Sequence, residues 1–365
     1  MKTVAVIGTR AQAIKMAPVI VAARDVGLPC HVVLTGQHLA TVDELLADFG
    51  LEANERLWQR SEIKRIFKGL GWSGIVLWRL WRLLRRQSHR DKTIVLVHGD
   101  TMSTLIGAFA GRLARCRVAH VEAGLRSGSL LDPFPEEIIR RIVTWLAEIA
   151  YCPGEEATSV VRRTGRYCVN TVENTVMDSI RMVLDKGDKT SSELPDSSYV
   201  IVSAHRMETV LRHRRLSALV DLVLAITRLY PVRFVLHPVT KDRLERSGLI
   251  ARLQESDRVE LTPRMGYAAF IRLASDSRAI LTDGGGNQEE MAYLGIPTLL
   301  LRNRSEREQG LDGNAKLIGL DSARAIRELE STDQQRKIKT LPIGSPSERI
   351  ANHMLRQRDS AEGRL

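Results

Sequence analysis

The sequence has few cysteines and no long apolar run. None of its four cysteines stands in a CxxC or Cys/His spacing of the kind that binds a metal (Cys30, Cys116, Cys152 and Cys168). We therefore expect reduced, structural thiols in a cytoplasmic protein. No apolar stretch reaches the roughly 18 residues of a membrane span. The chain also opens on an apolar strand instead of a leader-like segment, so we expect neither export nor a spanning helix.

The length and the order of apolar segments predict two α/β domains. A chain of 365 residues exceeds one ordinary hydrophobic core. Short apolar strands alternate with amphipathic helices, which predicts two doubly wound, Rossmann-like parallel sheets. Residues 1–184 form the predicted N-terminal domain, the polar run 185–198 forms the linker, and 198–340 forms the C-terminal domain.

The expected strands cover residues 3–7, 31–34, 94–97, 118–121, 199–202, 233–236, 259–261, 279–281 and 298–301. The expected helices cover residues 13–23, 104–113 and 136–150, a further helix ends near Leu229, and residues 43–49 are interpreted as a turn region.

The positive charge is concentrated in one segment. Residues 57–92 hold ten basic and two acidic residues, a net +8 of the total +11, and four of the five tryptophans. This concentration argues against nucleic-acid binding. Leu77, Leu80, Trp81 and Leu84 follow helical spacing, and arginines occupy another face. We favour a domain helix that packs its apolar stripe and solvates its arginines. The alternative is peripheral contact of residues 72–86 with an anionic membrane.

Three carboxylates stand in loop-like positions within 37 residues. Asp100 and Glu122 each follow a predicted buried strand, and Glu136 comes shortly afterwards. In open α/β sheets the carboxyl ends of strands face the ligand crevice. Carboxylates near one another and near apolar walls are suited to taking and giving protons. Each one alone could be a helix cap or an ion-pair partner, but three together favour an active site.

Two segments favour phosphate binding. Gly8-Thr9-Arg10 closes the first strand and opens a helix, and Lys15 follows. The run Gly284, Gly285 and Gly286 lies between a later strand and helix, with Glu290 placed to reach a ribose diol. Neither segment is a GxGxxG fingerprint or a Walker A loop. One phosphate-binding segment in each domain suggests a nucleotide-linked substrate in a cleft between the domains.

Basic side chains are expected at the same edges. His205 and Arg206 directly follow the strand 199–202. Arg302, Arg304 and Arg307 follow a later strand, where a guanidinium could contact a diphosphate.

With these residues the chain resembles the UDP-N-acetylglucosamine 2-epimerase family from about residue 3 to 320. The matching motifs are GTRAQAIKMAP at 8–18, TGQH at 35–38, HGDT at 98–101, HVEAGLRSG at 120–128, FPEE at 134–137, His205-Arg206, TDGGGNQEE at 282–290 and SER at 305–307. The resemblance implies a glycosyltransferase-B-like fold and a homodimer. It also implies that residues 341–365 form a C-terminal helix, around 346–356, and a tail that return to the first domain.

The resemblance also implies a mechanism. UDP would leave C1 of the sugar while a carboxylate takes the C2 proton, and re-addition with a proton on the other face would invert C2. No redox cofactor or metal is implied, and which carboxylate acts as acid or base stays open. The residues implied around the sugar and diphosphate are Arg10, Lys15, Asp100, Glu122, Glu136 and His205. Those implied to hold UDP are Phe270, Gly284, Gly285, Gly286, Glu290 and Arg307.

Several residues depart from the family pattern. Gln12 replaces a Glu, Gly284 replaces a Ser, Glu173 replaces a Gly, and residues 55–92 replace the loop tied to activation by substrate. Alternatives therefore stay open: a hydrolysing relative that releases N-acetylmannosamine and UDP, an epimerase of a modified UDP-amino sugar, a membrane-docked retaining glycosyltransferase, or an inactive nucleotide-sugar binder.

Overall fold

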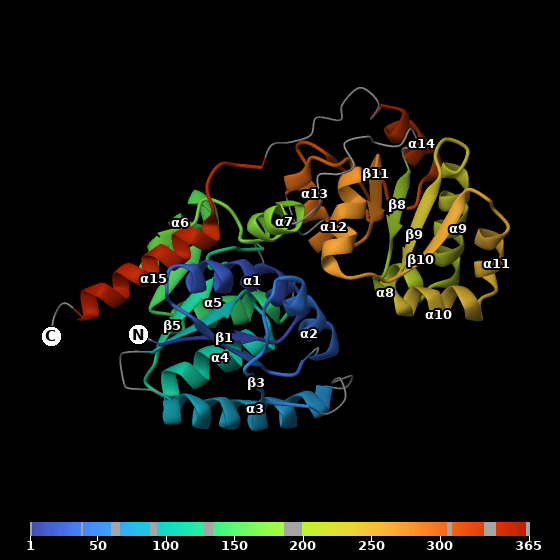
Figure 1. Cartoon of the computed structure of the whole chain (residues 1–365). Coiled ribbons are helices and arrows are strands. Elements are labelled where there is room, and N and C mark those ends of the chain that lie inside the picture. The colour runs from blue at the N-terminus through green and yellow to red at the C-terminus, as the bar shows by residue number, and fades with distance from the viewer. Residues whose placement is uncertain are drawn as a thin grey trace. The chain divides into compact units, whose positions relative to one another are not determined.

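The structure is a computed structural model that describes residues 2–37, 39–59, 66–87, 93–127, 134–185, 199–304, 309–331 and 341–362. The chain forms two compact units. Unit 1 comprises Met1–Met182 and Ile343–Leu365, and unit 2 comprises Val183–Pro342. Each unit contains one parallel sheet with helices packed on it (Figure 1). The predicted pair of doubly wound, Rossmann-like α/β domains is therefore confirmed.

The sheet of unit 1 positions the first group of candidate residues. Its strand order is β3-β2-β1-β4-β5-β6-β7, and every neighbouring pair is parallel. The order reverses at β1, which lies between β2 and β4, and ligands bind at such a switch point in open α/β sheets. The strands are β1 Lys2–Ile7, β2 Cys30–Leu34, β3 Glu55–Arg56, β4 Thr93–His98, β5 Arg117–Val121, β6 Ile149–Cys152 and β7 Cys168–Asn170.

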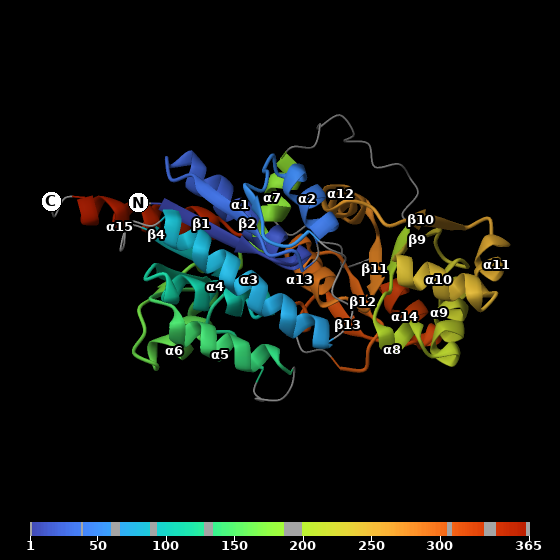
Figure 2. The same cartoon turned by 90° about the horizontal axis from the view of Figure 1, so that it is seen from below.

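The helices of unit 1 pack in two groups. The segments α3, α4 and α5 lie side by side (Figure 2), whereas α1 packs against α2 and α15. Their bounds are α1 Arg10–Asp25, α2 Leu39–Asp48, α3 Ile66–Gln87, α4 Met102–Leu113, α5 Glu136–Leu146, α6 Gly154–Arg162, α7 Val176–Asp185 and α15 Pro346–Glu362.

The helix α3 packs its apolar stripe into the core of unit 1. Leu80 and Leu84 are buried there with apolar side chains of β1 and β4, and Leu77 and Trp81 pack against the same cluster. The favoured interpretation of this segment as a domain helix is therefore confirmed. The indole of Trp78 instead lies at the surface, 51% exposed. Among the described residues no helix is both long and apolar enough to cross a bilayer.

Unit 2 repeats the architecture with six strands in the order β10-β9-β8-β11-β12-β13, all paired in parallel. Its core packs the apolar side chains of β8, β9 and β11 against α9. The strands are β8 Val200–Ser203, β9 Val232–Leu236, β10 Val259–Pro263, β11 Ala279–Thr282, β12 Thr298–Leu300 and β13 Ala315–Leu317. The helices are α8 Met207–Val210, α9 His213–Ile226, α10 Pro238–Arg246, α11 Leu249–Gln254, α12 Tyr267–Asp276, α13 Gly285–Leu294 and α14 Ser322–Ser331.

Two local predictions were wrong. Most of the expected turn region 43–49, up to residue 48, belongs to the helix α2, whose Val42, Leu45 and Leu46 are buried at helical spacing. The helix expected over 136–150 ends at Leu146, because Ala147 is extended and 149–152 forms the buried strand β6. A four-residue apolar run continues a helix pattern as well as it starts a strand, so periodicity alone does not separate them.

Candidate active site

The turn after β1 is packed tightly against the start of α4. A Cβ added at Gly8 would lie 1.9 Å from Ser103 Oγ and 2.6 Å from Thr35 Oγ1, so only glycine fits there. The next residue, Thr9, caps α1 together with Gln12 in a reciprocal pair of hydrogen bonds. Arg10 is the first residue of this helix and Lys15 lies farther along it. The predicted strand-to-helix turn is therefore present.

The side chain of Gln12 links this turn to the end of β4. Its Oε1 accepts from the Gly8 and Thr9 backbone N–H groups at 2.9 and 3.1 Å. Its Nε2 donates to His98 O and to Thr104 Oγ1, each at 2.8 Å. The amide is 1% exposed, so all four contacts are made away from solvent. Sequence reasoning noted Gln12 only as a departure from the family and missed this link.

Glu122 is surrounded by groups from α1, β4 and the segment before α7. Its backbone lies in the left-handed region, with φ of 63°, directly after β5. Lys15 Nζ lies 2.5 Å from its Oε1, and Asn174 Nδ2 donates to the same oxygen at 2.7 Å. His98 Nε2 lies 3.0 Å from Oε2, without hydrogen-bond geometry. With 12% of its side chain exposed, this carboxylate is nearly buried and has fixed donors.

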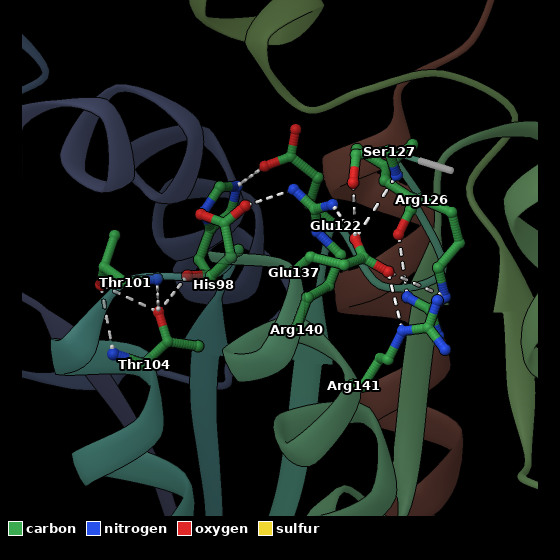
Figure 3. A network of polar contacts seen from close by, with 12 residues as sticks. His98, Thr101, Thr104, Glu122, Arg126, Ser127, Glu137, Arg140 and Arg141 are labelled. Atoms are coloured by element: carbon green, nitrogen blue, oxygen red, sulfur yellow. Dashed lines mark hydrogen bonds and ion pairs between the residues drawn. The ribbon is translucent and has the colours of Figure 1, made fainter. Parts of the chain in front are cut away.

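Asp100 belongs to a second network, which is centred on α5. Arg140 donates to Asp100 Oδ2, and through its other terminal nitrogen to Glu137 Oε2 at 2.8 Å. Glu137 is fully buried and also accepts from Arg141 Nε at 2.8 Å. Figure 3 shows Glu137 surrounded by Arg140, Arg141, Arg126 and Ser127. Two of the three predicted carboxylates, Asp100 and Glu122, thus lie at neighbouring strand ends of one sheet.

Glu136 stands apart from these networks. It begins α5, and its Oε2 is buried without a hydrogen bond to any residue that the structure describes. The adjacent Glu137, which sequence reasoning quoted only within a motif, makes the ion pairs instead. The signal that could have identified Glu137 is its spacing of three and four residues from Arg140 and Arg141 on one helix.

His120 supports the turn that carries Asp100. Its imidazole is fully buried on β5, and burial lowers its pKa to about 4, so the ring is neutral at physiological pH. The Nε2 lies 2.8 Å from Gly99 O, which can only accept, so Nε2 carries the proton. Gly99 has φ of 67°, a conformation that glycine adopts without strain. His120 therefore fixes this turn and takes no proton near neutral pH.

In unit 2 the ends of β8 and β11 meet around Asp283. This fully buried carboxylate accepts from His205 N at 2.9 Å and from Arg206 N at 3.0 Å. His205 Nδ1 lies 3.6 Å from Asp283 Oδ1, and the His205 ring is 41% exposed. Its ring centroid lies 5.5 Å from that of His237, at the start of α10. Asp283 therefore fixes the backbone of His205, and the imidazole of His205 stays partly exposed.

The glycine run opens α13. Gly284 is the N-cap, and Gly285 and Gly286 are the first helical residues, so these three positions add no side chain of their own to the helix start. Glu290, 6% exposed, lies farther along the same helix. Phe270 is buried in α12 of the same unit, whereas Arg307 lies outside the described residues.

The predicted residues thus form two groups, one in each unit. Unit 1 holds Arg10, Lys15, Asp100, Glu122 and Glu136, and unit 2 holds His205, Phe270, Gly284, Gly285, Gly286 and Glu290. The neighbouring residues that sequence reasoning did not select fall into two sets. Direct partners of the predicted residues are His98, Arg140, Asn174 and Asp283, and residues one contact farther away are Gln12 and Glu137.

Comparison with known proteins gives a family. A family model described as UDP-N-acetylglucosamine 2-epimerase matches residues 22–354. This chain belongs to the UDP-N-acetylglucosamine 2-epimerase family. The enzyme of that name from Escherichia coli K12 is 33% identical over 349 residues, covering 90% of this chain and 89% of the relative.

Solved structures of family members have the same fold. A Staphylococcus aureus MnaA–UDP co-structure matches with a TM-score of 0.79 and 30% identity, covering 98% of this chain and 97% of that one. The Methanocaldococcus jannaschii UDP-GlcNAc 2-epimerase in complex with UDP-GlcNAc and UDP matches with a TM-score of 0.78 and 27% identity, covering 99% of this chain and all of that one. The expected glycosyltransferase-B-like class of fold is thereby supported.

Two residues that depart from the family motifs, Gln12 and Gly284, fit the groups around them in this chain. At position 12 an amide donates to a carbonyl oxygen, which a carboxylate cannot do. At position 284 an added Cβ would lie 3.0 Å from His205 Cε1, closer than ordinary van der Waals contact. Gly284 therefore leaves room for the observed position of the His205 ring.

Proposed function

We propose that this chain interconverts UDP-N-acetylglucosamine and UDP-N-acetylmannosamine without hydrolysis. The observation that carries the proposal is the pair of fixed carboxylates at neighbouring strand ends, Asp100 with Arg140 and Glu122 with Lys15. Inverting a carbon centre by proton transfer requires groups that take and return protons at defined positions. The similar Methanocaldococcus jannaschii enzyme, solved in complex with UDP-GlcNAc and UDP, supports this substrate class.

The proposed reaction balances without an oxidant or a hydrolytic water. A carboxylate takes the C2 proton, the C2–H electrons form a C1–C2 double bond, and the C1–O bond breaks with its electron pair on the departing UDP. In the second half, UDP oxygen attacks C1 again and C2 receives a proton on the opposite face. We assign proton transfer to Asp100, Glu122 and Glu136.

Cationic groups would stabilise the departing diphosphate. In unit 1 these are Arg10 and Lys15, and in unit 2 we assign this role to His205 and Arg307. The glycine-rich start of α13 would donate hydrogen bonds to phosphate oxygens, because the backbone N–H groups at a helix start carry partial positive charge. Glu290 and Phe270 are the proposed ribose and uracil contacts.

Product analysis tests the proposal. Purified protein is incubated with UDP-N-acetylglucosamine, and the products are separated by anion-exchange chromatography. UDP-N-acetylmannosamine is expected from wild type, and the E122Q variant should form it at least about 100-fold more slowly. Free N-acetylmannosamine with UDP would instead identify the hydrolysing alternative. Unchanged substrate would leave a modified UDP-amino sugar, glycosyl transfer or loss of activity as the explanation.

We also propose a homodimer that forms through the exposed surface of α3, α4 and α5. Large apolar side chains are exposed on these three adjacent helices: Ile75, Trp78, Phe109, Leu113 and Trp145. Aromatic and arginine side chains are enriched at homodimer interfaces, and Arg82 lies over the Trp78 ring at 5.3 Å. Sedimentation should show a dimer for wild type and a weaker dimer for W78S. Flotation of wild type, but not W78S, with anionic vesicles would support membrane contact through 72–86 instead.

A further inference from the structure

Arg140 lies between two carboxylates that come from different elements. It donates to Asp100 Oδ2 with one terminal nitrogen and to Glu137 Oε2 with the other. Its side chain is 12% exposed, whereas that of Asp100 is 27% exposed. Asp100 follows β4 and Arg140 stands on α5, so the ion pair ties the loop after β4 to a helix on the neighbouring part of the fold.

Glu137 anchors the guanidinium of Arg140. It is fully buried one helical turn before Arg140, and its Oε1 accepts from Arg141 Nε at 2.8 Å. The Ser127 backbone N–H reaches Glu137 Oε2 at 3.4 Å, which connects the loop after β5 to the same carboxylate. A planar guanidinium that contacts two carboxylates has little freedom to rotate. The helix α5 therefore sets the orientation of the Arg140 guanidinium and, through it, the position of Asp100.

We infer that Arg140 is a positioning residue that holds Asp100 for proton transfer, with Glu137 as its anchor. It acts through Asp100 and makes no contact with the reacting sugar. The inference rests on the proposed epimerase reaction. Glu122 has a separate set of partners in Lys15 and Asn174, so loss of Arg140 should leave that carboxylate in place.

A double-mutant cycle tests whether Arg140 acts through Asp100. We expect R140M to lower kcat by about 100-fold, because a carboxylate displaced by about 1 Å transfers protons poorly. KM should change by less than about threefold, since ground-state binding is retained. In the D100N background, R140M should lower the residual kcat by less than about twofold. Equal penalties in both backgrounds would overturn the inference, because Arg140 would then act independently of Asp100.

The matched control is R141M. Arg141 donates to the other oxygen of Glu137, Oε1, is 48% exposed, and has no described contact with Asp100. Its loss should leave kcat within about twofold of wild type. R140K keeps the charge but replaces the fork by one ammonium, so it should retain more activity than R140M. Equal losses in R140M and R141M would indicate a role in folding alone and contradict the inference.

Crystal structures of R140M and R141M without substrate separate this inference from the proposed function. The Asp100 carboxylate should move by about 1 Å or more in R140M and stay in place in R141M. An unmoved Asp100 in R140M would overturn the positioning role whatever the enzyme catalyses. A displaced Asp100, found together with wild-type protein that forms no UDP-N-acetylmannosamine, would support the positioning contact and contradict the proposed reaction.

Discussion

The substitution Q12E probes the link between the turn after β1 and the end of β4. It replaces a buried NH₂ group, which donates to His98 O and Thr104 Oγ1 at 2.8 Å, by an oxygen. A carboxylate oxygen facing the His98 carbonyl oxygen has no hydrogen to share. Loss of two hydrogen bonds, each worth about 1 kcal/mol, and burial of a charge should together lower the free energy of unfolding by about 3 kcal/mol at pH 7.5.

The pH dependence of that loss is the sharper part of the prediction. Burial favours the neutral form of the introduced carboxyl, and a protonated carboxyl can donate to His98 O again. The difference between wild type and Q12E should therefore shrink as the pH falls from 7.5 to 5.5. The neutral control Q12M loses the same donors without adding a charge, so its difference from wild type should not depend on pH.

Urea unfolding followed by tryptophan fluorescence measures this difference. The chain has five tryptophans, and all lie within unit 1: Trp58, Trp72, Trp78, Trp81 and Trp145. The signal thus reports the unit that contains Gln12. Equal stability of Q12E and wild type at pH 7.5, or a difference that grows on acidification, would refute the reasoning. Either result would mean that the amide is not the donor in this network.

Three further predictions concern packing and pH in unit 1. Burial depresses the pKa of His120 from 6.5 to about 4, so the stability that the neutral ring contributes is complete above pH 6.5 and is lost as the pH falls towards 4. The free energy of unfolding of wild type, measured in urea, should fall by about 3 kcal/mol over that range, and that of H120Q should fall by less. G8A places a Cβ 1.9 Å from Ser103 Oγ and should lower the melting temperature as an overpacked core variant does, with partial recovery in G8A/S103G; an unchanged melting temperature would show that α4 can shift. D178A removes the acceptor of the Ser345 hydroxyl and the Ser347 backbone N–H and should speed proteolytic removal of α15, which equal cleavage rates would contradict.

The alternation of strands and helices could be predicted because buried parallel strands are short apolar runs with turn residues after them. That is also why Asp100 and Glu122 could be placed at strand ends before their surroundings were known. The carboxylates were selected by position in the chain, which requires no knowledge of their partners.

The partners themselves could not be predicted. Gln12 contacts groups 86 and 92 residues away, and no local pattern encodes such a pairing. The choice between Glu136 and Glu137 depends on the rotation of α5 about its axis, since adjacent helical residues point about 100° apart. The sequence places two glutamates at that helix start without showing which one faces Arg140 and Arg141.

Hydrogen exchange at C2 tests the central claim most directly. UDP-N-acetylglucosamine is incubated with wild-type protein in deuterated water and followed by proton NMR. The account predicts a new anomeric signal from UDP-N-acetylmannosamine, with deuterium replacing the C2 proton in that product, and neither change with heat-inactivated protein. UDP-N-acetylmannosamine that keeps its C2 proton, or UDP-N-acetylglucosamine that stays unchanged, would contradict proton transfer at C2 by the carboxylates of unit 1.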